Sequence, residues 1–306
     1  MRPGYAGLYD DRFGFPGKFD LVDCAQCGHR RLLAEFTPAQ LEVLYSSSYP
    51  RATLALEDWR PHEEIKGWPA WFSGERGYAF RWVPRGVRVL DIGCGFGQTL
   101  GYHRDRGCEA QGVEADSNIL RVAKKFGLNA KVGLFDPDGY ANEYFDYVTL
   151  DQVIEHVTDP VEMLSGVARV LRKGGIAILS TPNSRGWGAR MFGRRWINWH
   201  APYHLQQFSR RSMEISAQRA ELKLTDVKTI TSSEWLFYQW MHLLSMPGNG
   251  DPSYFWSPHP LKDKFLQRKI VRFARILHGL RINHWITRLF DSLGAGDNQL
   301  FFLEKI

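Results

Sequence analysis

The stretch over residues 87–97, Val-Arg-Val-Leu-Asp-Ile-Gly-Cys-Gly-Phe-Gly, constrains the fold of this chain more than any other. Its apolar residues are typical of a strand that is covered on both faces, and the acid Asp91 stands at its end. Three glycines then remove side chains where a ligand has to approach the backbone. The residues that follow continue into a helix whose free N–H groups face the same point. The stretch therefore predicts a strand, a ligand-binding turn and a helix in direct succession.

The spacing of these glycines distinguishes two classes of cofactor. Dinucleotide-binding proteins carry Gly-x-Gly-x-x-Gly, which would place the third glycine at position 98, and that residue is Gln98. The pattern here is Gly-x-Gly-x-Gly, and Asp91 precedes it by two residues. A carboxylate at that position would repel a pyrophosphate and attract an ammonium group. S-Adenosylmethionine has no phosphate and carries an amino group and a sulfonium, so the residues favour it over a dinucleotide.

Residues 89–97 resemble the first motif of the class I S-adenosylmethionine-dependent methyltransferases, and the resemblance extends to Asn183. The segment after the fourth expected strand is similar to the ubiquinone-type and sugar methyltransferase group. The further matching segments are residues 111–116, 145–150, 152–157, 159–160 and 171–183. The resemblance implies a methyl-transferring enzyme with a Rossmann-like α/β fold, built on a doubly wound, mostly parallel sheet of seven strands. It also implies that the last strand is an antiparallel edge strand.

The order of apolar and polar segments supports this α/β organisation, because alternating strands and helices build a parallel sheet with helices on both faces. Strands are expected near residues 87–91, 109–114, 129–133, 145–150, 176–181, 224–231 and 299–304. Helices are expected over 38–45, 61–82 and 210–220 and after Asp159, a turn over 171–175, and a loop or lid over 184–207. We expect three parts: a small N-terminal piece over 1–50, the cofactor-binding domain over 51–231 and 296–306, and a helical, basic insertion over 232–295.

The candidate cofactor-binding residues follow from the resemblance and from their positions at strand ends. Glu114 has the spacing of a carboxylate that binds the two ribose hydroxyls. Asp151 and Gln152 follow the fourth strand and are expected near the methionine part of the cofactor, although helix capping explains Asp151 equally well. A turn that binds no ligand is the alternative for the whole set. The candidates are Asp91, Gly93, Cys94, Gly95, Gly97, Glu114, Ala115, Asp151 and Gln152.

Two histidines are candidates for catalysis. Methyl transfer is an in-line displacement, so alignment supplies much of the rate, and a hydroxyl acceptor also needs a base near neutral pH. His204 and the residues around it resemble a His-Leu-x-x-Phe-Ser element of small-molecule and sugar methyltransferases, which would place it over the site. His156 follows the fourth strand by about one helical turn and is the second candidate. A purely structural role is the alternative for each.

These features predict O-methylation of a sugar or of a lipid-linked or cell-surface precursor. Related carbon-methylating enzymes carry a Glu before the histidine, where this chain has Tyr203. A nucleic-acid methyltransferase is disfavoured, because residues 180–183 lack the Asn/Asp-Pro-Pro-aromatic pattern and the chain has no Pro-Cys nucleophile motif. A non-catalytic binding protein is a third alternative, against which the glycine turn and Glu114 argue.

The cysteines predict neither a disulfide framework nor a metal site. Cys24 and Cys27 form one Cys-x-x-Cys pair, whereas structural zinc usually needs two pairs, as in sugar-modifying members of the family. Cys94 and Cys108 belong to the main domain. Four cysteines, no signal peptide in the first residues, and an apolar run over 235–246 too short to span a bilayer predict a cytoplasmic protein.

The positive charge of the chain is concentrated in one segment. Between residues 261 and 292, eight basic residues face two acidic ones, and this excess equals the formal net charge of +6 of the whole chain. An apolar stripe there predicts an amphipathic helix that packs on its own domain, with a break or a second helix near Gly279. The alternative is contact with an anionic membrane, at the inner membrane surface, or with a phosphate-bearing substrate. The stripe consists of Leu266, Ile270, Phe273, Leu277 and Leu280.

Overall fold

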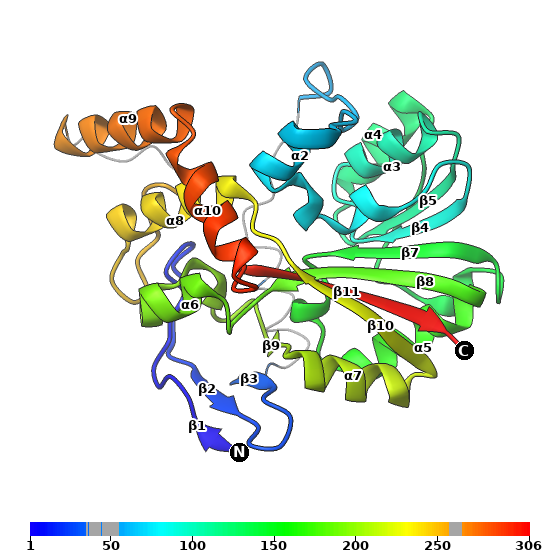
Figure 1. Ribbon diagram of the computed structural model, residues 1–306, viewed down its shortest axis with the longest axis horizontal. Helices are drawn as coiled ribbons and strands as arrows, with labels where there is room; N and C mark the ends of the chain where they lie inside the picture. The colour runs from blue at the N-terminus through cyan, green and yellow to red at the C-terminus, as the bar shows by residue number, and fades with distance from the viewer. Residues whose placement is uncertain (35, 37–43, 45–54, 257–264) are drawn as a thin grey trace.

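The computed structural model describes residues 1–34, 36, 44, 55–256 and 265–306, so the helix expected over 38–45 lies almost wholly outside the described residues. Within them the strands form one sheet of seven and one of four (Figure 1). The strand order of the larger sheet is β10-β11-β8-β7-β4-β5-β6. This sheet, with helices between its strands, confirms the predicted α/β class.

Apart from the start of β8, the strands of the larger sheet begin and end close to the predicted positions. They are β4 (Arg88–Ile92), β5 (Glu109–Glu114), β6 (Asn129–Val132), β7 (Phe145–Asp151), β8 (Leu171–Pro182), β10 (Leu222–Thr229) and β11 (Asn298–Lys305). From β6 to β8 every neighbouring pair is parallel. Strand β11 is antiparallel to both β8 and β10, which confirms the predicted reversal of the last strand.

The predicted edge position of the last strand is wrong. β11 lies inside the sheet between β8 and β10, and the two edges are β10 and β6. Leu300, Phe301 and Leu303 of β11 are fully buried, and they pack on opposite faces of the sheet. On β10, Lys223 and Thr225 are exposed. A strand that is apolar on both faces needs cover on both, so β11 occupies the interior and the more polar β10 forms the edge.

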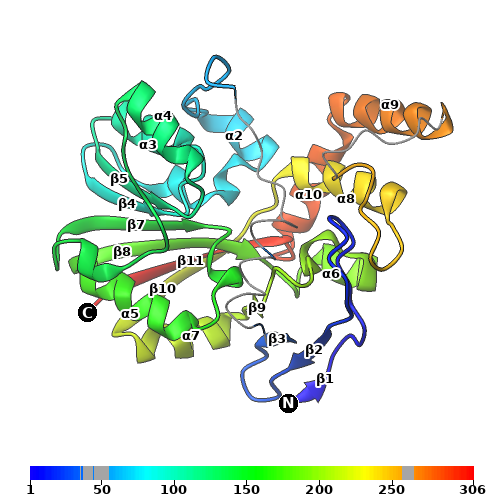
Figure 2. The same cartoon turned by 180° about the vertical axis from the view of Figure 1, so that it is seen from behind.

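Helices cover both faces of this sheet (Figures 1 and 2). Leu90 packs on one face, in a cluster with side chains of α5 (Pro160–Val170) and α7 (Arg210–Arg219). Its neighbour Val89 packs on the other face, where α3 (Gln98–Arg104) and α4 (Asn118–Phe126) also bury their apolar residues around Ala110. Successive strand residues point to opposite faces, so the apolar run of β4 is explained by burial on both sides.

Two helices begin at the predicted capping residues. Asp159 accepts hydrogen bonds from the N–H groups of Val161 and Glu162 at the start of α5. Ser209 accepts one from the N–H of Ser212 at the start of α7. A side-chain oxygen at this position satisfies donors that the first helical turn cannot satisfy itself. Both predictions rested on local chemistry, and both are confirmed.

Two predicted boundaries are wrong. The helix expected over 61–82 is limited to α2 (Gly67–Ser73), because Gly74 adopts φ 80° and ends it, and two single 3₁₀ turns follow at Glu75–Gly77 and Ala79–Trp82. The turn expected over 171–175 is part of β8, whose register with β7 shifts between Phe145 and Tyr147. A left-handed glycine is a strong helix stop, and a bulge lets the longer strand keep pairing.

The segment over 184–207, predicted as a loop or lid, is a packed part of the molecule. It contains α6 (Trp187–Phe192), 3₁₀ turns at Gly193–Arg195 and Ile197–Trp199, and the short strand β9 (Gln206–Gln207). Trp196 and Tyr203 are completely buried within it. Because neighbours surround this segment on several sides, its apolar residues show neither helical nor strand periodicity.

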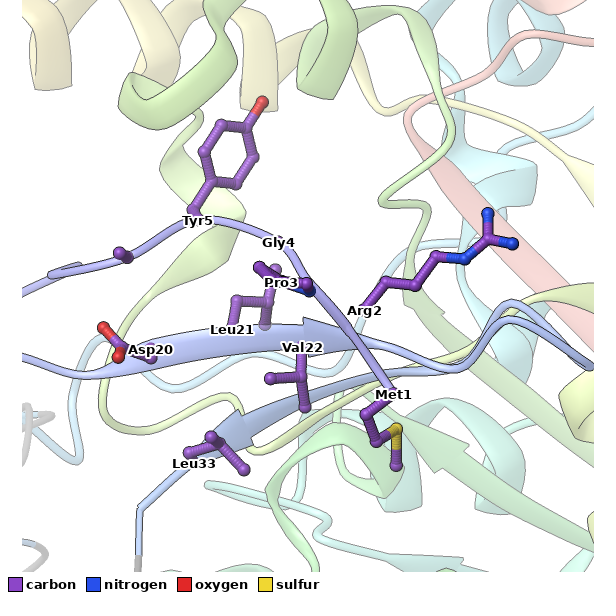
Figure 3. Close-up of a pocket in the computed structure, with 10 residues that line it drawn as sticks. Met1, Arg2, Pro3, Gly4, Tyr5, Asp20, Leu21, Val22 and Leu33 are labelled. Carbon is purple, nitrogen blue, oxygen red and sulfur yellow. The ribbon is translucent and has the colours of Figure 1, made fainter.

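The smaller sheet joins the N-terminal residues to this packed segment. It consists of β1 (Arg2–Pro3), β2 (Asp20–Asp23), β3 (Arg30–Leu33) and β9, with β9 paired to β3. A pocket of about 300 Å³ lies on this sheet, with Met1, Tyr5 and Leu33 among its lining residues (Figure 3). None of the predicted site residues lines it. The N-terminal sheet therefore supports the 184–207 segment and is separate from the cofactor turn.

In the described part of the chain, three helices lie between β10 and β11: α8 (Ser233–Ser245), α9 (Phe265–Gly279) and α10 (Ile282–Ser292). The break predicted near Gly279 is confirmed, since α9 ends there. The predicted burial of the apolar stripe is wrong for Phe273 and Leu280, which are 59% and 66% exposed, while Ala274 is buried. Periodicity locates an apolar face without showing whether anything covers it. Among the described residues, no helix has the length and apolar character needed to cross a membrane.

Asp297, directly before β11, connects the sheet to the 184–207 segment. Its carboxylate accepts hydrogen bonds from the Trp196 indole N–H at 2.7 Å and from the Gly188 N–H at 3.0 Å. A Cβ on Gly188 would lie 2.4 Å from a carboxylate oxygen of Asp297, so only glycine fits there. Burial raises the pKa of Asp297 from 3.8 to about 7. The folded protein therefore keeps this carboxyl protonated under conditions where the unfolded chain has lost the proton.

This raised pKa predicts a specific pH dependence of stability. Between about pH 4 and pH 7 the folded state holds the Asp297 proton and the unfolded state does not, so this group's contribution to stability falls as the pH rises. The difference in free energy of unfolding between the wild type and Asp297→Asn should decrease by up to about 1.4 kcal/mol per pH unit across that window. Urea denaturation at several pH values measures it. Asp105→Asn, at an exposed aspartate, is the control, and a difference that grows with pH would contradict the assignment.

Candidate cofactor and acceptor site

The three glycines of the turn after β4 all adopt left-handed backbone angles, with φ values of 76°, 54° and 72° for Gly93, Gly95 and Gly97. A Cβ on Gly93 would lie 2.5 Å from Val153, and one on Gly97 would lie 2.8 Å from Leu128. The space in front of Gly95 is open, with no atom within 4 Å of an added Cβ. Two of the glycines are therefore needed for packing, and Gly95 is the one that faces space where a ligand can lie.

Asp91 connects three elements at the carboxyl edge of the sheet. It is 2% exposed, and its two carboxylate oxygens accept hydrogen bonds from the hydroxyls of Thr99 on α3 and of Thr149 on β7, the latter at 2.7 Å. Burial raises the pKa of Asp91 to about 6. A buried carboxyl of this kind favours a cationic group nearby, because a positive charge would stabilise its ionised form.

Glu114 connects the end of β5 to the glycine turn. One carboxylate oxygen accepts the Gly95 N–H at 2.9 Å and the other accepts the Asp116 N–H at 2.9 Å. Each oxygen can accept a further hydrogen bond, so hydroxyls of a ligand can still bind here. Ala115 follows on the surface, and Cys94 is buried under the turn, where burial raises the pKa of its thiol. The structure thus brings the predicted cofactor residues of β4 and β5 together.

Asp151 and Gln152 stand at the end of β7 and are held by neighbours within the protein. Asp151 accepts hydrogen bonds from the N–H groups of Ala79, at 2.7 Å, and Phe80, at 3.2 Å, and so caps the 3₁₀ turn at Ala79–Trp82. Burial raises its pKa to about 7. Gln152 adopts φ 54° and donates hydrogen bonds to Ser180 and Asn298, each at 3.1 Å. A non-glycine residue held in this conformation marks a place where the backbone shape is fixed by its surroundings.

The two candidate catalytic histidines lie against each other. The rings of His156 and His204 are 4.7 Å apart, edge to face, although the residues come from distant parts of the chain. Nδ1 of His156 donates to the Tyr203 carbonyl at 3.0 Å, and Nδ1 of His204 donates to the Asn198 carbonyl at 2.9 Å. In a neutral histidine this leaves Nε2 as the acceptor. Burial lowers the pKa of His156 to about 4 and that of His204 well below 6.5, so both are neutral at pH 7.

The two histidines differ in how far they are exposed to solvent. His156 is partly exposed, whereas His204 is 6% exposed and its Nε2 lies 3.4 Å from Nδ1 of His200. The N-terminal residues support this arrangement, since the hydroxyl of Tyr203 donates to Asp10 at 3.1 Å. Of the two residues, His156 is therefore the one with some surface open to solvent. The resemblance of the His204 segment to a family element gave no information on this difference.

Glu155 is a residue of the site that sequence reasoning missed. It is completely buried, one oxygen accepts the Thr181 hydroxyl at 3.0 Å, and the other, Oε1, has no hydrogen-bond partner among the residues that the structure describes. Burial raises its pKa to about 8. The Glu-His pair at 155–156 was the only available signal, because the contact with His204 depends on the fold. One ligand atom each of Glu155, His156 and His204 lies within 4.8 Å of the others, so the trio could hold a metal ion.

The predicted Cys-x-x-Cys element lies apart from that trio. Cys24 and Cys27 are free thiols at the surface of the N-terminal sheet. The nearby His29 forms hydrogen bonds to Gln206 at 2.8 Å and to Ser212 at 3.4 Å, so both of its ring nitrogens are engaged. Among the described residues, the set whose ligand atoms lie close enough for a metal ion is therefore the buried trio, not the cysteine pair.

Comparison with known proteins places this site in a family. A family model described as a methyltransferase domain matches residues 66–227, which end before α8. The ubiquinone biosynthesis O-methyltransferase of Xanthomonas oryzae pv. oryzae is 29% identical over 164 residues, which cover 49% of this chain and 68% of that protein. The protein of the same name from Alkalilimnicola ehrlichii is 31% identical over 162 residues, which cover 48% and 64%.

Solved structures give a weaker likeness. The phosphoethanolamine N-methyltransferase 2 of Haemonchus contortus, in complex with S-adenosyl-L-methionine, aligns with a TM-score of 0.49 and 17% identity. The alignment covers 90% of this chain and 62% of that chain. A likeness of this degree supports no statement about activity.

The glycine turn predicts a matched pair of variants with different outcomes. Gly93→Ala should lower the free energy of unfolding by about 2–4 kcal/mol, because the added methyl group meets Val153 and the backbone is left-handed. Gly95→Ala carries the backbone strain alone and should cost about 1–2 kcal/mol. Chemical denaturation of both proteins measures the difference. Equal losses would show that the packing against Val153 does not matter.

Proposed function

Because the chain belongs to the class I S-adenosylmethionine-dependent methyltransferases, we propose that it methylates an oxygen atom of a sugar or of a lipid-linked or cell-surface precursor. The relatives that it matches over about half its length are named ubiquinone biosynthesis O-methyltransferases, which supports a small molecule and an oxygen acceptor. The observation that carries the proposal is a pair of neutral histidines in contact with each other. His156, shortly after the end of β7, packs against His204.

The cofactor is proposed to bind along the ends of β4, β5 and β7. The open space at Gly95 and the remaining acceptor capacity of Glu114 fit a nucleoside with its ribose hydroxyls. Asp91 would favour the cationic amino-acid end. When bound, S-adenosylmethionine supplies an electrophilic methyl group. The protein then has to align the acceptor, exclude water and take up the acceptor's proton.

His156 is proposed to take up that proton, and His204 to position it. The sequence favoured His204 for this role, but His156 is partly exposed whereas His204 is buried, and this difference favours His156. Its Nδ1–H is fixed on the Tyr203 carbonyl, so the ring orientation and tautomer are set in advance. A pKa of about 4 keeps the ring unprotonated, and so able to accept a proton, at every pH above about 5.

Removing the charge of Asp91 tests the cofactor assignment. Asp91→Asn should weaken S-adenosylmethionine binding roughly tenfold to hundredfold, as expected for the loss of a hydrogen bond to a charged group. S-Adenosylhomocysteine, which keeps the ammonium group and lacks the sulfonium, should lose affinity to the same extent. Isothermal titration calorimetry measures both, with Asp105→Asn at the exposed end of α3 as the control. Unchanged affinity for both ligands would remove Asp91 from the cofactor site.

Changing each histidine tests the catalytic assignment. Wild-type protein is first screened against sugar and lipid-linked acceptors with methyl-labelled S-adenosylmethionine, and the products are identified by mass spectrometry. His156→Gln should then lower kcat roughly 10²–10⁴-fold without changing cofactor affinity. The wild-type rate should not fall between pH 8 and about pH 5, because His156 stays neutral over that range.

The companion variant His204→Gln separates positioning from proton transfer. It should lower kcat less than His156→Gln does, because the ring of His156 loses its neighbour but keeps the Tyr203 carbonyl. Full turnover in the His156 variant would assign proton transfer elsewhere. A larger loss in the His204 variant than in the His156 variant would reverse the two roles.

A further inference from the structure

Helix α10 carries a row of apolar side chains that the neighbouring described residues leave exposed. Ile282, Trp285 and Leu289, with Leu293 just beyond the helix end, are 40%, 60%, 59% and 70% exposed. Their spacing of three, four and four residues places them on one face of the helix. Single exposed apolar residues are ordinary, but a continuous row on one helix face marks an interaction surface.

Two tryptophans of α2 extend this row. The ring of Trp285 lies 4.8 Å from that of Phe72, and Trp68 stacks on the same Phe72 at 4.5 Å. Trp68 and Trp71 are 55% and 47% exposed. Helices α2 and α10 lie beside each other in Figures 1 and 2. We call the combined surface the tryptophan face; it consists of Trp68, Trp71, Ile282, Trp285, Leu289 and Leu293.

Exposed basic residues lie on α9 and at the start of α10, next to the tryptophan face. Lys269, Arg272 and Arg275 of α9 and Arg281 at the start of α10 are all exposed. The sequences of α9 and α10 contain one acid, Asp291, and it pairs inward with Arg288 at 2.7 Å and with Thr231. Arg281 also borders a hollow of about 350 Å³ between α2 and the turn from α9 to α10, which Phe72 and His284 line as well. Helices that carry exposed basic residues and helices that carry exposed aromatic residues therefore meet where α10 contacts both α2 and α9.

We propose that the tryptophan face and the arginines beside it bind the surface of a bilayer that contains anionic lipid. Tryptophan is the residue type enriched at membrane–water interfaces, and basic side chains are attracted to anionic head groups. Lys269, Arg272, Arg275 and Arg281 are exposed on α9 and at the start of α10, so they can attract an anionic surface to this part of the molecule.

Helix α8 joins this surface to the segment that carries His204. It contacts both α9 and α10. On its other side, Gln239 accepts the Ile197 N–H at 2.8 Å and donates to the Arg195 carbonyl at 2.9 Å, and His242 lies 3.3 Å from Asp11. The inference rests on the proposed function in one respect: a docked enzyme would take a lipid-linked acceptor from the membrane. The docking itself stands on the surface alone.

Vesicle binding by the full chain tests the proposal. Co-sedimentation is compared for vesicles of phosphatidylcholine alone and of phosphatidylcholine with phosphatidylglycerol, and binding should be strong only in the second case and should weaken with added salt. Arg272→Gln with Arg275→Gln should lower the partition coefficient roughly 30-fold. Trp285→Ser with Leu289→Ser should lower it roughly tenfold or more. Leu134→Ser, at an 85% exposed leucine after β6, is the matched control and should bind as the wild type does.

Several results would overturn the proposal. Equal binding to neutral and anionic vesicles would contradict the role of the arginines, and an equal loss in the Leu134 control would contradict the role of this face. A wild type that sediments as a dimer, binds no vesicles and becomes monomeric with Trp285→Ser and Leu289→Ser would make the face a contact between two copies of the chain. Lipid-embedded bromine atoms should quench tryptophan fluorescence in the wild type more than in Trp285→Phe, and equal quenching would place Trp285 away from the bilayer.

The same proteins separate this inference from the proposed function. All surface variants should bind S-adenosylmethionine with wild-type affinity in calorimetry, because none of the changed residues lies at the glycine turn. Methyl transfer to a hydroxyl acceptor without vesicle binding would refute the docking alone. Vesicle binding without transfer to any sugar or lipid-linked acceptor would refute the proposed function and leave the docking in place.

Discussion

The buried carboxyl group of Asp91 holds together the elements on which the rest of the site depends. Parallel strands bring their carboxyl ends to one edge of a sheet, and here the hydroxyls of Thr99 and Thr149 tie α3 and β7 to β4 through the two oxygens of one side chain. Glu114 repeats the arrangement between β5 and the glycine turn. The backbone of the turn is thus fixed before any ligand binds, which lowers the ordering cost that binding would otherwise carry.

Local chemistry made much of the fold predictable from the sequence. The strand at 109–114 has the predicted bounds, and Asp159 and Ser209 cap the helices that they were expected to cap. Each of these features depends on residues that are neighbours in the chain: the alternation or apolarity of a strand, or an oxygen placed before a helix. The turn after β4 was predictable for the same reason. Its three glycines are close together in the chain, and glycine adopts a left-handed backbone more readily than other residues.

The features that the sequence could not supply depend on contacts between distant residues. The interior place of β11 follows from its pairing with both β8 and β10, and nothing within residues 298–305 shows how many partners the strand has. Glu155 became part of the site only because folding brings His204 to it. In and just after α9, the helical period of Phe273 and Leu280 was visible in the sequence. Their exposure, however, depends on what lies beside the helix. The buried residues of the 184–207 segment follow neither a helical nor a strand period, so the sequence did not show that this segment is packed.

Burial moves the titratable groups of the site in one direction, toward neutrality. It raises the pKa values of the acids Asp91, Asp151 and Glu155 and lowers those of His156 and His204. A cation that enters beside Asp91 can ionise an acid whose pKa already lies near neutral pH. A phosphate would instead keep these acids protonated, so it would gain no ionic attraction from them. The preference for a cationic cofactor therefore follows from burial at this edge of the sheet as well as from the position of a single aspartate.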